Sequence, residues 1–141
     1  MNIRKLNAFD AKEWKEFLEV RKQLGGYSRE ISRSEFIKIY DYMTRQNSVI
    51  FVGIVDKAIV ATAKLNIETK WFDNVAIIED VVVHQDHRKR GFGKEIVSYL
   101  VEQTKARGDC YKIIVLTKDN LEHFYNESGL SRTGISMSKY F

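Results

Sequence analysis

Apolar side chains recur at helical spacing in the first part of the chain. The residues that mark the first such stretch are Trp14, Phe17, Leu18 and Leu24. Asp10 stands in front of them as a candidate N-cap, because a short side-chain oxygen there accepts hydrogen bonds from the free amides of a first helical turn. Gly25-Gly26 is expected to end the stretch, since glycine readily adopts the left-handed conformation found at helix ends. The pattern therefore predicts an amphipathic helix between these positions.

A second helix is predicted directly after this break. Ser32 is followed three residues later by Glu35, which is the spacing of a capping box. The apolar positions behind this box are Phe36, Ile37, Ile39, Tyr40 and Met43. With a short strand near residues 3–6, the chain is expected to begin as one strand and two helices.

Three β-branched and apolar runs follow, over residues 48–55, 58–67 and 75–83. Asp56-Lys57 separates the first two runs, and so short a connection suits a tight turn and a hairpin. The third run is almost continuously apolar, as in a strand that is buried on both faces. These runs are expected to form the centre of a sheet.

The last part of the chain predicts a long helix, two strands and a short helix. The apolar face of the long helix consists of Ile96, Val97, Leu100 and Val101. Gly108 is expected to end that helix. Strands are predicted over residues 111–116 and 131–140, with a short helix over residues 121–127 between them. The predicted order is β-αα-βββ-α-β-α-β, an α/β architecture in a single domain over residues 1–141.

Composition narrows the class of protein further. Hydrophobic residues make up 44% and charged residues 30% of the 141 residues, which excludes disordered, collagen-like and membrane-spanning classes. The formal charge of +4, from 23 basic and 19 acidic side chains, is too small to identify a nucleic-acid binder. Cys110 is the single cysteine, so no disulfide can form within the chain and a reducing compartment is the simplest expectation. No segment approaches the roughly 20 apolar residues of a membrane span. A cytoplasmic protein without membrane or nucleic-acid partners is expected.

A basic loop with two glycines, residues 88–94, joins the third apolar run to the long helix. Glycine lets the backbone approach a ligand closely, and the free amides at a helix N-terminus bind phosphate oxygens. The dinucleotide fingerprint requires a third glycine where this chain has Glu95. The nucleoside triphosphate loop requires a hydroxyl at that same position, directly after Gly93-Lys94. The loop therefore favours the binding of a pyrophosphate group, but not that of a dinucleotide or a nucleoside triphosphate.

Two motifs of this chain resemble those of the GNAT superfamily of N-acyltransferases. Arg88, Gly91 and Gly93 match Arg/Gln-x-x-Gly-x-Gly/Ala, which cradles the pyrophosphate of coenzyme A in that superfamily. Phe124-Tyr125 and the later Gly129 resemble its second signature, Phe-Tyr-x-x-x-Gly-Phe. The resemblance implies a mixed, mostly antiparallel central sheet flanked by helices, with acetyl-CoA as co-substrate. The alternative from the residues alone is a solvated basic loop and an ordinary pair of core aromatic residues.

Three further segments, residues 61–65, 78–83 and 110–113, resemble the glucosamine 6-phosphate N-acetyltransferase family. The resemblance covers the chain from roughly Leu24 onward. It implies acetylation of the amine of glucosamine 6-phosphate in amino-sugar biosynthesis, by direct attack without an acyl-enzyme. It also implies a homodimer in which the partner completes the acceptor site. Gly25 stands where members of that family usually have a threonine that contacts the substrate.

The resemblance also implies which residues form the site. Coenzyme A contacts are implied for Val81, Val82, Val83, Arg88, Lys89, Arg90, Gly91, Phe92, Gly93, Lys94, Asn120 and Tyr125. Contacts to the sugar phosphate are implied for Glu79, Asp80, Tyr111 and Lys112. Lys70 and Lys139 are weaker candidates for a contact to the phosphate, because most lysines are simply solvated.

Acetyl transfer to an amine requires a proton acceptor and hydrogen-bond donors for the thioester oxygen. Glu79 is the candidate base, because a carboxylate in an apolar strand is desolvated and becomes more basic. Asp80 is expected on the opposite strand face, where it orients substrate or structure, unless a bulge intervenes. The resemblance implies that such a bulge splays the strand from its neighbour, so that the amide of Val81 or Val83 holds the thioester oxygen.

The departing thiolate requires a proton donor, and Tyr125 is the candidate. Its phenol can donate a hydrogen bond, and GNAT enzymes carry that residue in the Phe-Tyr signature. The alternative for Tyr125 is an ordinary tyrosine of the core. The alternative for Glu79 and Asp80 is that a lysine or arginine simply neutralises each carboxylate. An acyl-cysteine at Cys110 lacks a matching histidine, and the histidines lack zinc-binding spacing, so no metal is expected.

Two other functions are compatible with these residues. The same fold can acetylate another small amine or a protein amino group, which a screen of amines with acetyl-CoA would separate. A non-catalytic module can instead bind a polyanion through the basic residues 87–90. That module would show salt-dependent nucleic-acid affinity and no release of thiol.

Overall fold

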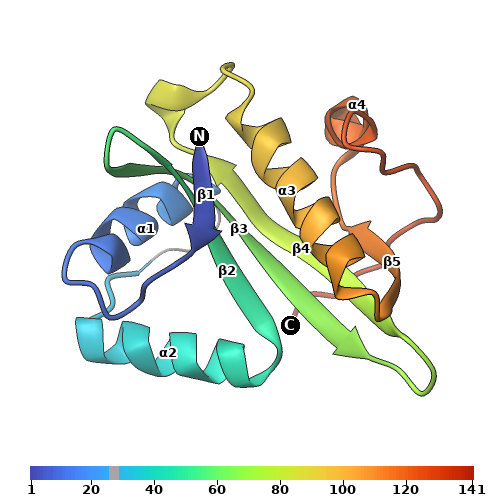
Figure 1. Cartoon of the computed structure of the whole chain (residues 1–141), viewed down its shortest axis with the longest axis horizontal. Helices are drawn as coiled ribbons and strands as arrows, with labels where there is room; N and C mark the ends of the chain where they lie inside the picture. Colours follow the sequence, from blue (N-terminus) through green and yellow to red (C-terminus); the bar gives the residue numbers. More distant parts are fainter. Residues whose placement is uncertain (26–28) are drawn as a thin grey trace.

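The centre of the computed structural model, which describes residues 1–25 and 29–141, is one five-stranded sheet (Figure 1). Its strands are β1 (Asn2–Lys5), β2 (Ser48–Val55), β3 (Ala58–Thr69), β4 (Asn74–Val83) and β5 (Cys110–Val115). They lie in the order β1-β2-β3-β4-β5, and the first four pair antiparallel with their neighbours. β5 joins β4 in parallel. The predicted mixed, mostly antiparallel fold is confirmed.

The first hairpin forms where the sequence predicts it. Asp56 and Lys57 link β2 to β3 with φ angles of +49° and +65°. Two successive left-handed residues are the mark of a tight type I′ turn, whose twist matches that of the strands. Val55 consequently pairs with Ala58 at the first rung of the hairpin.

Helices cover both faces of the sheet (Figure 1). α1 (Glu13–Lys22) and α2 (Arg33–Arg45) lie on one face, and α3 (Phe92–Arg107) lies on the other. The sheet residues packed toward α1 and α2 include Ile50, Val52, Ile59 and Val82. Those packed toward α3 include Phe51, Ala63, Leu65 and Ile78. Successive strand residues thus contribute to opposite cores, as the alternation of side chains requires.

The predicted helix ends agree with the structure in most respects. Asp10 accepts hydrogen bonds from the amides of Lys12 and Glu13 at 2.8 and 3.0 Å, from a turn just before α1. Ser32 caps α2 by accepting from the amide of Glu35 at 3.2 Å. Leu24 was predicted to belong to the apolar face of the first helix. This is wrong, because α1 ends at Lys22 and Leu24 is exposed.

Gly108 ends α3 as predicted, whereas α1 has Gln23 as its C-cap, two residues before the glycine that was expected to end it. Gly25 has a φ angle of +85°, and Gly108 has one of +73° at the end of α3. Gly26, the second glycine of the predicted break, lies outside the described residues. Within α3, Ile96, Val97 and Leu100 are fully buried as predicted, because this face lies on β3, β4 and β5.

The prediction of a strand over residues 131–140 is wrong. β5 is followed by a 3-10 turn (Asp119–Leu121) and the short helix α4 (Glu122–Asn126), and residues 131–141 then form no strand. Ile135 and Met137 are each 89% exposed. Alternation of apolar and polar residues stabilises a strand only where the apolar face has a surface to cover, and this segment has none within the described part of its own chain.

Candidate active site

A β-bulge interrupts the pairing of β3 and β4. Lys64 pairs with Glu79 and Thr62 pairs with Val82, so Ala63 alone faces the two residues between them, Asp80 and Val81. Asp80 has a φ angle of +54°, a left-handed conformation that is rare for a residue inside a strand. One extra residue in β4 is therefore accommodated at Asp80.

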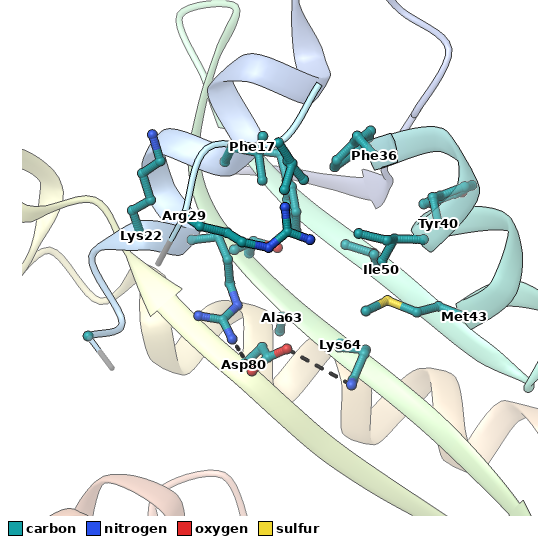
Figure 2. A pocket seen from close by; sticks show the side chains of 16 residues that line it. Phe17, Lys22, Arg29, Phe36, Tyr40, Met43, Ile50, Ala63, Lys64 and Asp80 are labelled. Carbon is teal, nitrogen blue, oxygen red and sulfur yellow. Dashed lines mark hydrogen bonds and ion pairs between the residues drawn. The ribbon is translucent and has the colours of Figure 1, made fainter. Parts of the chain in front are cut away.

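The bulge brings two carboxylates to the same face of the sheet. Lys64 Nζ lies 3.0 Å from Glu79 Oε2 and 3.9 Å from Asp80 Oδ2. Arg21 of α1 donates from Nη2 to Asp80 Oδ1 at 3.0 Å. The expectation that Glu79 and Asp80 face opposite sides is wrong, because the extra residue breaks the alternation, as the bulge alternative allowed. Figure 2 shows Asp80 between its two cationic partners.

The expected desolvation of Glu79 is also wrong. Its side chain is 45% exposed, because the two helices on this face leave its strand position open to solvent. The alternative in which a cation neutralises each carboxylate matches the observed geometry: Lys64 serves both, and Arg21 serves Asp80. Lys64, which is 19% exposed, thus links the carboxylates to the strand opposite.

On its other edge, β4 separates from β5. The two strands pair only as far as Ile78 and Val115, while β4 continues to Val83. The carbonyl of Val83 accepts from Arg88 Nε at 3.1 Å, whereas the amide of His84 donates to Val60 of β3 at 2.8 Å. Successive residues of a strand direct their peptide groups to opposite edges.

The amide of Val83, and by the same alternation that of Val81, therefore points away from β3 into the opening that β5 leaves. The side chain of Val82 is buried against α1 and α2 and only its backbone is near this opening. The structure thus supplies the splayed strands on which the proposed oxyanion contact depends.

The basic loop lies at the mouth of this opening. Arg88, Lys89, Arg90 and Gly91 are exposed, and Gly91 adopts a φ angle of +81° just before α3. The first hydrogen bond of α3 runs from the amide of Glu95 to the carbonyl of Gly91 at 3.0 Å. The amides of Phe92, Gly93 and Lys94 precede that bond and lack an intrahelical acceptor, which makes this helix end suited to an anion.

The two signature motifs are in contact with each other. A side-chain carbon placed on Gly93 would lie 3.2 Å from the ring of Phe124 and 3.6 Å from Val83 Cγ2. The missing side chain lets α4 pack closely against the first turn of α3. Phe124 and Tyr125 meet edge to face, with ring centroids 4.9 Å apart.

Tyr125 is 8% exposed and packs in the same core as Ile96 and Val97 of α3. Burial raises the pKa of Tyr125, and the nearby Thr117 side chain opposes that rise to a smaller extent. The phenol therefore keeps its proton at neutral pH. Because Thr117 comes just after the end of β5, the hydroxyl lies on the same side as the opening between the strands.

A cavity of about 350 Å³ lies between α1, α2 and the sheet face that carries the bulge (Figure 2). Its apolar lining includes Phe17, Leu18, Phe36, Tyr40, Met43 and Ile50. Its charged lining consists of Arg21, Lys22, Arg29, Lys64 and Asp80. The cavity therefore ends on the bulge, opposite the opening between β4 and β5, and its size is that of a small-molecule site.

The remaining predicted acceptor contacts do not line this cavity. Tyr111 is 61% exposed, and the ammonium of Lys112 lies 5.3 Å from the centre of its ring. Lys112 pairs with Val75, four residues before Glu79, which places it about 13 Å away along the sheet. Lys70 forms an ion pair with Glu68 at the far end of β3.

Two other predicted residues lie at the surface. Lys139 lies over the ring of Phe141 in the exposed C-terminal segment, at 5.3 Å from the ring centre. Asn120 is exposed in the turn between β5 and α4.

Arg21 and Lys64 are the site residues that sequence reasoning missed. Lys64 stands between two buried residues in a strand otherwise rich in apolar side chains, which is a detectable signal for a partnered charge. No comparable signal marks Arg21, because several charged residues surround it on α1 and only the folded chain shows which of them faces Asp80.

Cys110 provides no support for an acyl-cysteine. Burial and the neighbouring Asp109 carboxylate raise the pKa of the Cys110 thiol, which disfavours the reactive thiolate. Within residues 1–25 and 29–141, no group of three or more His, Cys, Asp or Glu side chains is arranged to hold a metal ion. No helix in the same part of the chain is long and apolar enough to cross a membrane.

Comparisons of sequence place the chain among known enzymes. The model of the acetyltransferase (GNAT) family matches residues 11–130. A glucosamine 6-phosphate N-acetyltransferase from Arabidopsis thaliana is 34% identical over 145 residues, covering 99% of this chain and 95% of that protein. A glucosamine 6-phosphate N-acetyltransferase from Schizosaccharomyces pombe is 32% identical over 103 residues, covering 71% of this chain and 92% of that protein.

Solved structures agree with this placement. The crystal structure of the glucosamine-6-phosphate N-acetyltransferase from Arabidopsis thaliana superimposes with a TM-score of 0.89 at 31% identity, covering 99% of this chain and 97% of the other. A Trypanosoma brucei acetyltransferase gives the same TM-score at 28% identity, covering 99% of both chains. With the bulge, the splayed strands and both signature motifs in place, the chain belongs to the GNAT family of acetyltransferases.

Proposed function

We propose that this chain transfers the acetyl group of acetyl-CoA to the amine of glucosamine 6-phosphate, giving N-acetylglucosamine 6-phosphate and coenzyme A. The observation that carries the proposal is the bulge in β4: Asp80 lines a cavity on one side with Glu79 beside it, and free amides face an opening on the other side. Relatives named for this substrate match nearly the whole chain.

Coenzyme A is bound by the loop and the opening beside β4. The amides of Phe92, Gly93 and Lys94, with the exposed basic side chains of the loop, suit its pyrophosphate. The hydrogen bond from Arg88 to the carbonyl of Val83 fixes the basic loop relative to the end of β4. Asn120, near the end of β5, is positioned for a further contact.

Glu79 accepts the proton that the amine loses, directly or through a water molecule, since its exposed carboxylate is accessible to solvent. The nitrogen attacks the thioester carbon while the amides of Val81 and Val83 donate to the oxygen that becomes negative. The carbon–sulfur bond then breaks, and Tyr125 donates its proton to the sulfur. Asp80 orients the amine, with no covalent enzyme intermediate.

The proposed reaction is tested by measuring thiol release from acetyl-CoA with glucosamine 6-phosphate, glucosamine and a lysine-containing peptide as acceptors. Glucosamine 6-phosphate is expected to give the highest kcat/KM. Faster turnover of the peptide or of an unphosphorylated amine would instead identify the chain as a GNAT enzyme with another acceptor.

A second copy of the chain is proposed to complete the acceptor site. Lys70 lies six residues beyond Lys64, about 20 Å along the strand, which is longer than a hexose phosphate. Lys70 cannot therefore meet a sugar held at the bulge of its own chain. Trp71 and Phe72 beside it are 97% and 98% exposed, as expected for residues that a partner covers. In such a homodimer Lys70, like Tyr111, Lys112 and Lys139, acts on the partner's acceptor.

We predict that replacing Trp71 and Phe72 together by glutamate converts the protein to monomers and lowers activity in proportion. Sedimentation velocity and thiol release at one protein concentration measure both effects. Phe9→Glu is the control, because Phe9 is 65% exposed but belongs to the connection between β1 and α1 and not to that between β3 and β4. A wild-type protein that is monomeric and fully active would contradict the homodimer.

Tyr125→Phe is predicted to lower kcat about 10- to 100-fold with little change in the dissociation constant of coenzyme A. Losing one hydrogen bond to a developing anion costs roughly 1.5–3 kcal/mol in the transition state. Gly91→Val is expected to show the opposite pattern, weaker binding of coenzyme A, since its φ of +81° is unfavourable for valine. Calorimetry and steady-state kinetics separate the two, with Tyr99→Phe as a control. Equal losses of kcat and binding in Tyr125→Phe would indicate a packing role.

Glu79→Gln is predicted to lower kcat about 100-fold or more at neutral pH, because glutamine keeps the shape of the side chain but cannot accept the proton. The rate is measured between acidic and mildly alkaline pH. Asp80→Asn is the control, and a larger loss there than in Glu79→Gln would exchange the roles of the two carboxylates.

A further inference from the structure

Arg21 presents unused hydrogen-bond donors to the cavity beside the bulge. It lines the cavity from the last turn of α1 and bonds Asp80 Oδ1 from Nη2 at 3.0 Å, the contact drawn from Asp80 toward α1 in Figure 2. A guanidinium carries five N–H donors. Asp80 is the single partner of Arg21 among residues 1–25 and 29–141, and the Arg21 side chain is 35% exposed.

The other cations of the cavity lining already bind carboxylates more completely. Each of them has two carboxylates, or both oxygens of one carboxylate, as partners. These sets are Lys22 with Glu19 and Glu30, Arg29 with Glu35, and Lys64 with Glu79 and Asp80. Arg21 therefore has the largest capacity to accept an additional anion.

The structure also leaves space next to this guanidinium. Gly25, one helical turn after Arg21, lines the same cavity, and a side-chain carbon placed on it would have no atom of residues 1–25 and 29–141 within 4 Å, its chain neighbours aside. The apolar part of the wall, which includes Phe17 and Phe36, cannot pair with an anion. A planar guanidinium with open space beside it matches the geometry of a phosphate.

We propose that Arg21 binds the phosphate of the acceptor and makes the enzyme prefer a phosphorylated amine. The inference rests on the proposed function, because it assumes that the amine is held at Glu79 and Asp80. The guanidinium then bridges Asp80 and the phosphate, with one anion on each side. The sugar between them spans from the bulge to the space at Gly25.

Arg21→Met tests this directly, since methionine keeps an unbranched apolar side chain and removes the donors. We expect kcat/KM for glucosamine 6-phosphate to fall about 10- to 100-fold, as for the loss of a charged hydrogen bond. The value for glucosamine, which has no phosphate, is expected to fall by a clearly smaller factor, which reports only the lost ion pair between Arg21 and Asp80. Arg21→Lys should recover part of the preference, because it restores a charge without the fork.

An equal loss with both acceptors would overturn the proposal, because Arg21 would then act only through Asp80. Arg45→Met is the matched control: Arg45 pairs with Asp41 on α2 at 2.9 Å and does not line the cavity. Thermal unfolding of each variant establishes that the protein is folded before kinetics are compared.

Binding of glucose 6-phosphate, measured by calorimetry on protein saturated with coenzyme A, separates this inference from the proposed function. This probe has a hydroxyl in place of the amine and needs no turnover. If wild-type protein fails to acetylate glucosamine 6-phosphate but binds glucose 6-phosphate, and Arg21→Met does not, the proposed function fails and the phosphate contact stands. No binding to wild type, or equal binding to both proteins, overturns the contact.

Discussion

A single extra residue in β4 determines where every other part of the site lies. Without it, Glu79 and Asp80 would face opposite layers of the protein. With it, both carboxylates reach Lys64, and Asp80 also reaches Arg21 of the first helix. The left-handed conformation of Asp80 costs of order 1–3 kcal/mol, and the two ion pairs hold the residue in that conformation. The bulge therefore places a carboxylate for chemistry with an amine on the wall of a cavity whose other lining is mainly apolar or cationic.

One face of the sheet and the edge between β4 and β5 carry different parts of the candidate site. The face under α1 and α2 carries the carboxylates and the cavity, whereas the edge between β4 and β5 carries the free amides, the basic loop and Tyr125. Gly93 and Phe124 hold α3 and α4 together at that edge. In the proposed reaction the acetyl donor and the acceptor approach the same strand from different directions and meet at the bulge, as direct transfer between them requires.

Sequence patterns predicted the strands, the hairpin turn and the helices well, since each depends on local periodicity or on turn residues such as Asp56 and Gly108. They also found both signature motifs. Local patterns could not show the bulge, which only the family resemblance implied, because it depends on the register between β3 and β4, a relation between distant residues. The burial of Glu79 was overestimated because an apolar run does not show that α1 and α2 leave this position of the strand uncovered. The predicted terminal strand failed because alternation in residues 131–140 says nothing of what surface is available to cover it.

Deletion of Asp80 measures the importance of the bulge most directly. Removing one residue lets Val81 face Ala63 and leaves the pairs Lys64–Glu79 and Thr62–Val82 in place, so a regular strand can form without a shift elsewhere. We predict a folded protein that unfolds cooperatively but releases thiol from acetyl-CoA at less than about a hundredth of the wild-type rate, and well below Asp80→Asn, which keeps the bulge. A deletion variant as active as Asp80→Asn would contradict the role assigned to the bulge.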